Sequence, residues 1–237
     1  MGAIFTVTVR QLAGSKRLWL VLALVALPVL GAVLYHVGDS TNTPAGFADG
    51  LIGSLIVAGI LPLVMLLLAT SAFGNELDDR TLAYLVLKPL PRWQIVVPKA
   101  AAPIAVGGLP VAASGVVASA VIEGDTWGAV AVGLGLLAGA AAYTGVFTWL
   151  SLASKHSIVV GLIYVFVWEA SLAAYLDGVR FLSVRRYTLS LIHALDDERL
   201  RTVDIGLGAR AAAVGAGIAL VASTLLAVRR LSRMDVP

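Results

Sequence analysis

The chain has 237 residues, of which 59% are hydrophobic and 13% are charged, and its formal net charge is +3. Charged residues make up about a quarter of a soluble globular domain, so this composition excludes one, and a mean hydropathy of +0.93 indicates a membrane protein. The sequence contains no cysteine, which excludes disulfides, thiolate metal sites and cysteine nucleophiles.

The N-terminal segment before Arg17 mixes apolar and polar side chains, a pattern typical of a helix that lies on a membrane surface. Its apolar residues include Ile4, Phe5, Val7 and Leu12. A frayed terminus is the alternative. The first apolar run follows Lys16 and Arg17, is long enough to span a bilayer and has no convincing cleavage site after it, so we expect no signal peptide.

A membrane-spanning helix needs roughly 20 mostly apolar residues. Six such runs follow one another along the chain, at 18–37, 51–73, 100–122, 127–153, 158–176 and 209–228. We expect six transmembrane helices in one compact bundle. The fold class is therefore an all-α membrane protein, with residues 1–237 forming a single transmembrane domain.

Lysine and arginine favour the cytoplasmic ends of membrane helices. A cytoplasmic N-terminus places most of the basic residues inside and leaves the outer loops at 35–50 and 123–126 with none. We expect both termini to be cytoplasmic in a multi-pass protein of the inner, or cytoplasmic, cell membrane. Because the basic residues sit at segment ends and not along one polar face, the lipid bilayer is the expected partner, and no nucleic acid is.

Three of the spans, the third, the fourth and the sixth, carry several small residues. Gly135 and Gly139 form a GxxxG step, which lets helix backbones approach closely, either inside one bundle or between subunits. We favour packing inside the bundle. Four prolines lie within spans and predict kinks, at Pro28, Pro62, Pro103 and Pro110.

The polar stretch from Phe73 to Lys99 separates the second and third runs. Acidic residues open it, residues 81–87 have good helix propensity, and Pro89 and Pro91 halt the pattern. This predicts one short amphipathic helix. A second helix is expected to start near Arg92 and to continue into the third run.

Eight residues of this stretch occur in a characteristic order and spacing: Glu76, Thr81, Leu82, Leu85, Pro89, Arg92, Ile95 and Lys99. In this order the stretch resembles the loop between spans two and three of the permease subunits of type-2 ABC exporters, the ABC-2-type permease family. Arg80 stands where that family usually has Gly, and Pro98 where Gly often precedes the Lys. These departures bear on the local backbone and not on the identity of the loop.

The resemblance implies that Glu76 to Leu87 form a cytoplasmic coupling helix that docks on an ATPase subunit. The expected docking residues are Glu76, Asp79, Thr81, Leu82, Tyr84, Leu85, Pro89 and Arg92. It also implies an exporter in which the permease forms the translocation path with a second copy, or with a homologous permease, and works with two ATPase subunits. A solvated loop without a partner is the alternative for this stretch.

The segment from Asp177 to Gly208 is too long for a tight turn and too polar to span. Its spaced apolar residues predict interfacial or re-entrant helices between spans five and six. Permeases of type-2 ABC exporters are similar here, with short re-entrant helices between spans five and six that close the outer mouth of the path. An ordinary solvent loop with paired charges is the alternative.

Glu169 is the one acidic residue inside a predicted span. A carboxylate within the membrane is costly unless it is paired or hydrated, so Glu169 is a candidate for the translocation path. The alternative is that Tyr175, Arg180 or water simply satisfies it.

The sequence has no GxxxxGK[ST] loop, no HExxH and no GxSxG. ATP and Mg²⁺ are therefore expected in a separate ATPase subunit, and the chain itself is expected to be no enzyme and to bind no cofactor or metal. The alternative function is an ATP-independent protein, either half of a membrane carrier or a membrane anchor or assembly protein.

Overall fold

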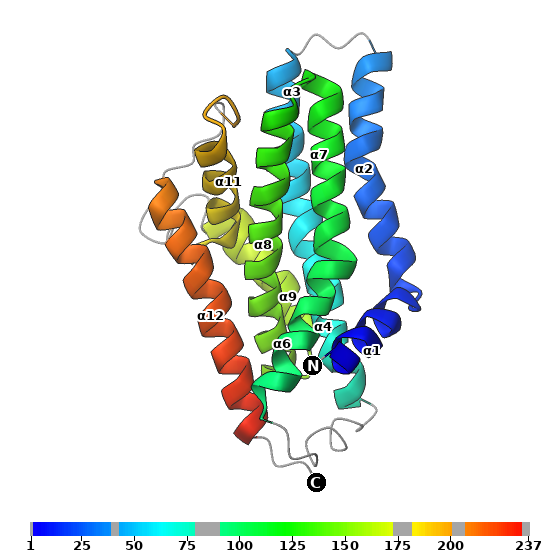
Figure 1. Cartoon of the computed structure of the whole chain (residues 1–237), viewed down its shortest axis with the longest axis vertical. Coiled ribbons are helices and arrows are strands. Elements are labelled where there is room, and N and C mark those ends of the chain that lie inside the picture. The colour runs from blue at the N-terminus through cyan, green and yellow to red at the C-terminus, as the bar shows by residue number, and fades with distance from the viewer. Residues whose placement is uncertain (1, 39–42, 79–90, 173–181, 201–206, 234–237) are drawn as a thin grey trace.

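The computed structural model describes residues 2–38, 43–78, 91–172, 182–200 and 207–233. Every regular element in these ranges is a helix. Figure 1 shows the long helices side by side in an elongated bundle. The described part of the chain is thus all-α, as its composition predicts.

Five stretches are long and apolar enough to cross a membrane, which confirms five of the six predicted spans. They are α2 (Arg17–Val37), Pro44–Gly74, Trp93–Glu123, α8 (Thr126–Ala153) and α12 (Ala209–Arg233). The second of them combines α3 (Pro44–Gly50), η1 (Leu51–Ile60) and the greater part of α4 (Leu61–Asp78), and the third combines α6 (Trp93–Pro103), η2 (Ile104–Gly108) and α7 (Leu109–Glu123).

The run predicted at 158–176 is described only in part. α9 (Ser157–Ile163) leads directly into η3 (Tyr164–Leu172), and residues 173–176 lie outside the described residues. The described length is shorter than the roughly 20 residues that cross a bilayer. A sixth span therefore stays a prediction.

Two of the composite stretches change from α-helical to π-helical geometry close to prolines. η1 ends just before Leu61 and Pro62, and η2 lies between Pro103 and Pro110. Proline has no N–H and its ring clashes with the carbonyl four residues earlier, so a regular α-helix cannot continue unchanged through it. The wider π turns are local adjustments of the kind that membrane helices tolerate when neighbouring helices cover them.

α8 is the central helix of the bundle. It packs against α4, α7, α12 and α11 (Val184–Leu195), while α2 packs chiefly against α7. Two thirds of the most apolar part of α8 is buried inside the chain (67%), compared with 17% for both α2 and α12. The apolar faces of α2 and α12 are therefore left for lipid or for another protein.

The GxxxG step of α8 packs inside the chain, as predicted. A Cβ atom at Gly135 would overlap Ile192, and one at Gly139 would overlap Thr188, both on α11. Absence of a side chain on this face of α8 is what lets α11 lie directly against it. The two glycines are thus used for packing between α8 and α11.

The N-terminal segment forms a helix, α1 (Gly2–Ala13), which lies across the lower end of the bundle in Figure 1 and packs against α6. Leu12 is fully buried. These residues therefore do not form a frayed terminus.

The two ends of the bundle are named below by what they carry. The hairpin end holds the last residues of α4, the start of α6, the α8–α9 junction and the end of α12. The Arg199 end holds the end of α7, the start of α8 and residues 196–200.

Candidate functional site

Most of the predicted docking residues lie outside the described residues. Asp79, Thr81, Leu82, Tyr84, Leu85 and Pro89 are not described at all, and for Glu76 only the backbone is described, within α4. Arg92 is described and precedes α6 with a half-buried side chain. The coupling helix thus stays a prediction, and the structure describes the two helices that lead into and out of it.

These two helices are joined by Lys99 at the hairpin end. Lys99 on α6 is 1% exposed. Its Nζ donates a hydrogen bond of 2.9 Å to the carbonyl of Ala72 on α4 and lies 4.7 Å from the centre of the Phe73 ring. A buried ammonium needs such partners, because burial without them is costly. The polar stretch 73–99 therefore begins and ends at one contact.

Apolar packing surrounds this contact. Phe73 belongs to a small buried cluster with residues from α6, α8 and α12. Its other members are Ala72, Ile95, Val96, Leu152, Ala227 and Leu231. Because residues of α4, α6, α8 and α12 pack directly against one another in this cluster, a displacement of α4 against α6 would act on α8 and α12.

Glu169 lies on η3, is 3% exposed and is fully engaged by hydrogen bonds. Its carboxylate accepts from Tyr164 Oη at 2.8 Å and from Ser183 Oγ at 2.6 Å. It also accepts from the backbone N–H groups of Val184 at 2.9 Å and Arg185 at 3.3 Å. Four donors converge on it, which is the arrangement that makes a buried carboxylate tolerable.

The acceptor position of Glu169 follows from how α11 begins. Ser183 is the N-cap of α11, and its Oγ accepts from the backbone N–H of Arg186. The first turn of a helix presents unpaired N–H groups and a partial positive charge. The carboxylate of Glu169 occupies that position and so ties the start of α11 to η3.

α11 runs alongside α8 in the direction of the Arg199 end. Its residues Thr188 and Ile192 meet Gly139 and Gly135, in that order, and Arg199 meets Gly128 near the start of α8. α11 therefore follows α8 from near the middle of that helix to its first turn. α11 thus lies inside the bundle, beside α8, and does not cover the end of the bundle from outside.

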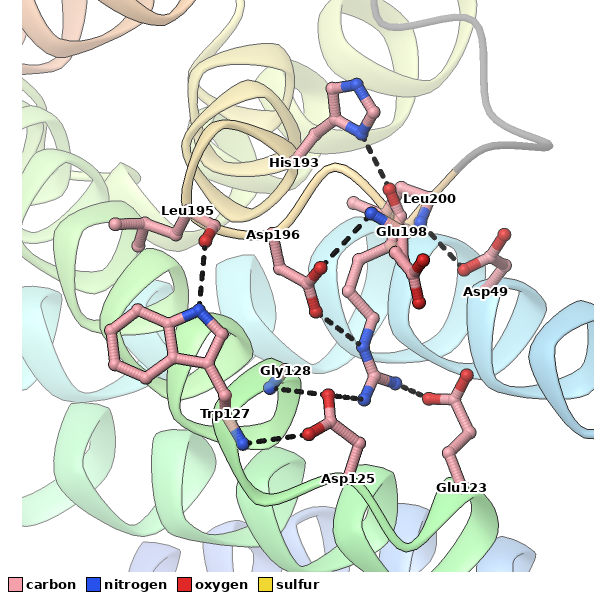
Figure 2. Close-up of polar contacts among 11 residues, drawn as sticks. Asp49, Glu123, Asp125, Trp127, Gly128, His193, Leu195, Asp196, Glu198 and Leu200 are labelled. Atoms are coloured by element: carbon pink, nitrogen blue, oxygen red, sulfur yellow. Dashed lines mark hydrogen bonds and ion pairs between the residues drawn. The ribbon is translucent and has the colours of Figure 1, made fainter.

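Arg199 joins two segments of the chain that are distant in sequence, 123–125 and 196–199, and Figure 2 shows the carboxylates that surround it. Its guanidinium group is in contact with Glu123 at the end of α7 and lies 3.3 Å from Asp125 before α8. It also lies 3.3 Å from Asp196, which follows α11. Arg199 itself is 3% exposed, so its charge is compensated by these carboxylates and only slightly by water.

The backbone on both sides of Arg199 is fixed as well. Leu200 adopts a left-handed conformation, with φ of 60°, which is unfavourable for a residue with a branched side chain. Its N–H donates to Asp49 Oδ1 at 2.8 Å, and the carbonyl of Arg199 lies 2.7 Å from His193 Nδ1. Burial lowers the pKa of Arg199, and the negative charge of Asp49 opposes that shift.

The residues around Arg199 were not expected to lie together. Asp125 and Asp196 are 71 positions apart, and the sequence gives no spacing pattern that joins them. One local signal exists: Asp125 follows Gly124 and precedes an apolar run, which is typical of a helix N-cap. Asp125 does accept from the N–H groups of Trp127 and Gly128. The partners expected for Glu169, Tyr175 and Arg180, lie outside the described residues.

The docking stretch and Glu169 are separate in the part of the chain that the structure describes. Arg92 stands at the hairpin end, and Glu169 stands at the start of α11. Among the described residues no group of three or more His, Asp or Glu side chains is arranged to hold a metal ion.

Residues 3–236 match a protein family described as ABC-2 family transporter protein. Comparison with curated proteins gives no match. The family match covers nearly the whole chain and includes both the hairpin stretch and the segment between η3 and α12. The chain therefore belongs to the ABC-2 family of membrane transport proteins and is a permease of the ABC-2 type.

Proposed function

We propose that this chain is the transmembrane permease subunit of an ATP-binding-cassette exporter, and that it forms the translocation path and couples to a separate ATPase subunit. The observation that carries this proposal is the family match over residues 3–236. The absence of a GxxxxGK[ST] loop from the sequence supports a separate ATPase, because that loop is what cradles ATP phosphates.

The hairpin stretch is the proposed docking element. Residues 76–87 connect two helices whose roots are joined by Lys99 and Ala72. A force on this stretch would be transmitted to α4 and α6 together, and through the cluster around Phe73 to α8 and α12. Two ATPase subunits and a second permease copy, identical or homologous, complete the proposed complex.

The proposed orientation places the hairpin end in the cytoplasm and the Arg199 end outside, with both termini inside. Basic residues at the hairpin end support it: Arg10, Lys16, Arg17, Arg92, Lys99, Lys155, Arg229, Arg230 and Arg233. In this orientation 158–176 is the fifth span, α1 lies at the inner surface, and α11 is a re-entrant helix that covers the outer part of the path.

Glu169 is proposed to act in the path through α11. Its four hydrogen bonds hold the start of that helix inside the bundle. A change in the position of η3 would therefore move α11, and with it the outer end of the path.

Affinity purification of the chain from its native membrane tests the proposed partnership. A soluble subunit with a GxxxxGK[ST] loop should be recovered in mild detergent, and its repeated absence would favour the carrier or anchor alternative.

The orientation in the membrane is tested separately by cysteine labelling, because the sequence contains no cysteine of its own. Thr126→Cys should react with an impermeant thiol reagent added outside intact cells, and Lys16→Cys should not.

A further inference from the structure

A cavity of about 700 Å³ opens at the hairpin end. Its walls come from α4, the end of α8, the start of α9 and one residue each of α2 and α12. Four of its lining residues are Arg, Lys or His side chains, namely Arg17, Lys155, His156 and Arg230. None of the described residues around it is acidic.

The two arginines are held in place by neutral acceptors. Arg17 donates to Ser71 Oγ, and Arg230 Nε donates to the carbonyl of Leu152 at 3.4 Å. Each guanidinium group has five N–H donors, so most of them stay available. Among the described residues no carboxylate forms an ion pair with Arg17, Lys155 or Arg230.

The positive charge of the cavity is thus not compensated within the described part of the chain. This distinguishes it from Arg199, whose guanidinium is surrounded by three carboxylates. Cations brought together without counter-charges repel one another, and an anion between them removes that repulsion. Planar guanidinium groups are well suited to phosphate oxygens.

Part of the cavity lining is apolar. Ile158 and Val159 line it and are 41% and 55% exposed, at the beginning of the apolar run of α9. Exposed aliphatic residues of a membrane helix face lipid tails. The cavity therefore offers cations to the head group of a lipid and an apolar edge to its acyl chains. This lining suits an amphiphilic anion better than a small soluble anion.

We propose that this cavity binds a phosphate group, and that its source is the head group of an anionic phospholipid of the inner leaflet. Basic pockets between membrane helices on the cytoplasmic side suit such head groups. The assignment to the inner leaflet rests on the orientation in the proposed function. The binding site itself does not, because it depends only on residues of this chain.

The test measures the thermal stability of the purified chain in a neutral detergent against increasing concentrations of a probe. A ligand that binds the folded state raises the unfolding midpoint, and its concentration dependence gives an apparent Kd. The probes are short-chain phosphatidylglycerol, short-chain phosphatidylcholine and inorganic phosphate. Phosphatidylglycerol should stabilise the chain saturably, and phosphatidylcholine and phosphate should do so only weakly.

Two sets of variants carry the same change in net charge. The first combines Arg17→Gln, Lys155→Gln and Arg230→Gln, and should weaken phosphatidylglycerol binding on the order of a hundredfold, at about fivefold for each charge near the head group. The control set combines Lys16→Gln, Arg229→Gln and Arg233→Gln, whose parents lie at the same end but do not line the cavity. The control set should bind within about twofold of the unaltered chain, because its charges do not line the cavity and salt screens their effect on a bound head group.

Lys155→Gln alone guards against misfolding, because Lys155 makes no hydrogen bond or ion pair in the described structure and its loss should leave stability unchanged. It should weaken binding about fivefold. Equal weakening by the control set, or no saturable effect of phosphatidylglycerol, would overturn the site. Equal stabilisation by inorganic phosphate would make it a site for free phosphate.

The remaining outcomes separate this inference from the proposed function. If the cavity variant bound phosphatidylglycerol normally and lost an ATPase subunit in a pull-down, the basic wall would be a protein-docking surface and the lipid site would be wrong. If lipid binding followed the prediction but cysteine labelling were reversed, the lipid site would stand and the proposed orientation would fail.

Discussion

The ammonium group of Lys99 lies 4.7 Å from the centre of the Phe73 ring, so the residues that bound the longest early polar stretch are in contact. Lys99 also donates to the carbonyl of Ala72. One side chain therefore holds α4 and α6 together at the point where both leave the apolar bundle.

Replacement of Lys99 tests this contact. Lys99→Met keeps the aliphatic stem and removes the charged donor, so it should lower the free energy of unfolding by about 1.5–3 kcal/mol, the range for hydrogen bonds to charged groups. The measurement is thermal or denaturant unfolding in detergent. Lys16→Met, at an exposed position of the same end, is the control. Equal stability of the two variants would show that Lys99 does not hold the hairpin roots.

Glu169→Gln tests whether the carboxylate positions α11. The amide nitrogen of glutamine would face donors, because two backbone N–H groups and two hydroxyls point at this side chain. We expect stability to fall by about 1.5–3 kcal/mol. Tyr164→Phe, which removes one of the four bonds, should cost about 1 kcal/mol. Unchanged stability with lost transport would instead place Glu169 in direct contact with the transported molecule.

Arg199→Gln should loosen the Arg199 end, because it leaves Glu123, Asp125 and Asp196 close together without their cation. A fully buried pair would cost about 3–5 kcal/mol to break, but the Asp125 side chain is 51% exposed, so we expect about 1–3 kcal/mol. Hydrogen exchange should rise in α11 and at the α7–α8 junction. Arg210→Gln, at an exposed position of α12, should change neither quantity.

Gly139→Leu should displace α11 from α8. A Cβ atom at this position already overlaps Thr188, so a larger side chain forces the helices apart at a cost of about 1–3 kcal/mol or more. Gly217→Leu is the matched control, because nothing lies within 4 Å of a Cβ placed there. Unfolding of both variants in the same detergent decides between them. If Gly139→Leu were as stable as Gly217→Leu, the close approach of α11 to α8 would be wrong.

The helical class and five spans could be predicted from the sequence, because the length and hydropathy of an apolar run decide whether a helix can cross a bilayer. It also placed Gly135 and Gly139 at an internal contact, since the GxxxG spacing fixes which residues share a helix face. The partner helix was not predicted. Identification of α11 as that partner needs the path of the chain between η3 and α12, which no local pattern specifies.

The partners in the buried polar contacts could not be predicted from local sequence patterns. Glu169 stood out as an acidic residue in an apolar run, yet its partners at Ser183 and Val184 follow from tertiary structure. Arg199 looked like one of several basic residues in a polar segment. Its role depends on three segments that lie far apart in the sequence, around Asp49, Glu123 and Asp196. The spacing of these residues in the sequence does not indicate that they meet.

Docking of residues 76–87 on an ATPase subunit is tested by the variant Leu85→Asp. If Leu85 enters a groove on the partner, aspartate would bury an unpaired carboxylate there, and loss of such an anchor typically costs more than about 1 kcal/mol of binding energy. ATPase activity of the reconstituted complex, measured beside a pull-down, should fall sharply, while the chain stays folded and monodisperse and Asp78→Ala behaves like the unaltered protein. If Leu85→Asp kept the ATPase activity and the partner binding of the unaltered protein, residues 76–87 would not be the docking element.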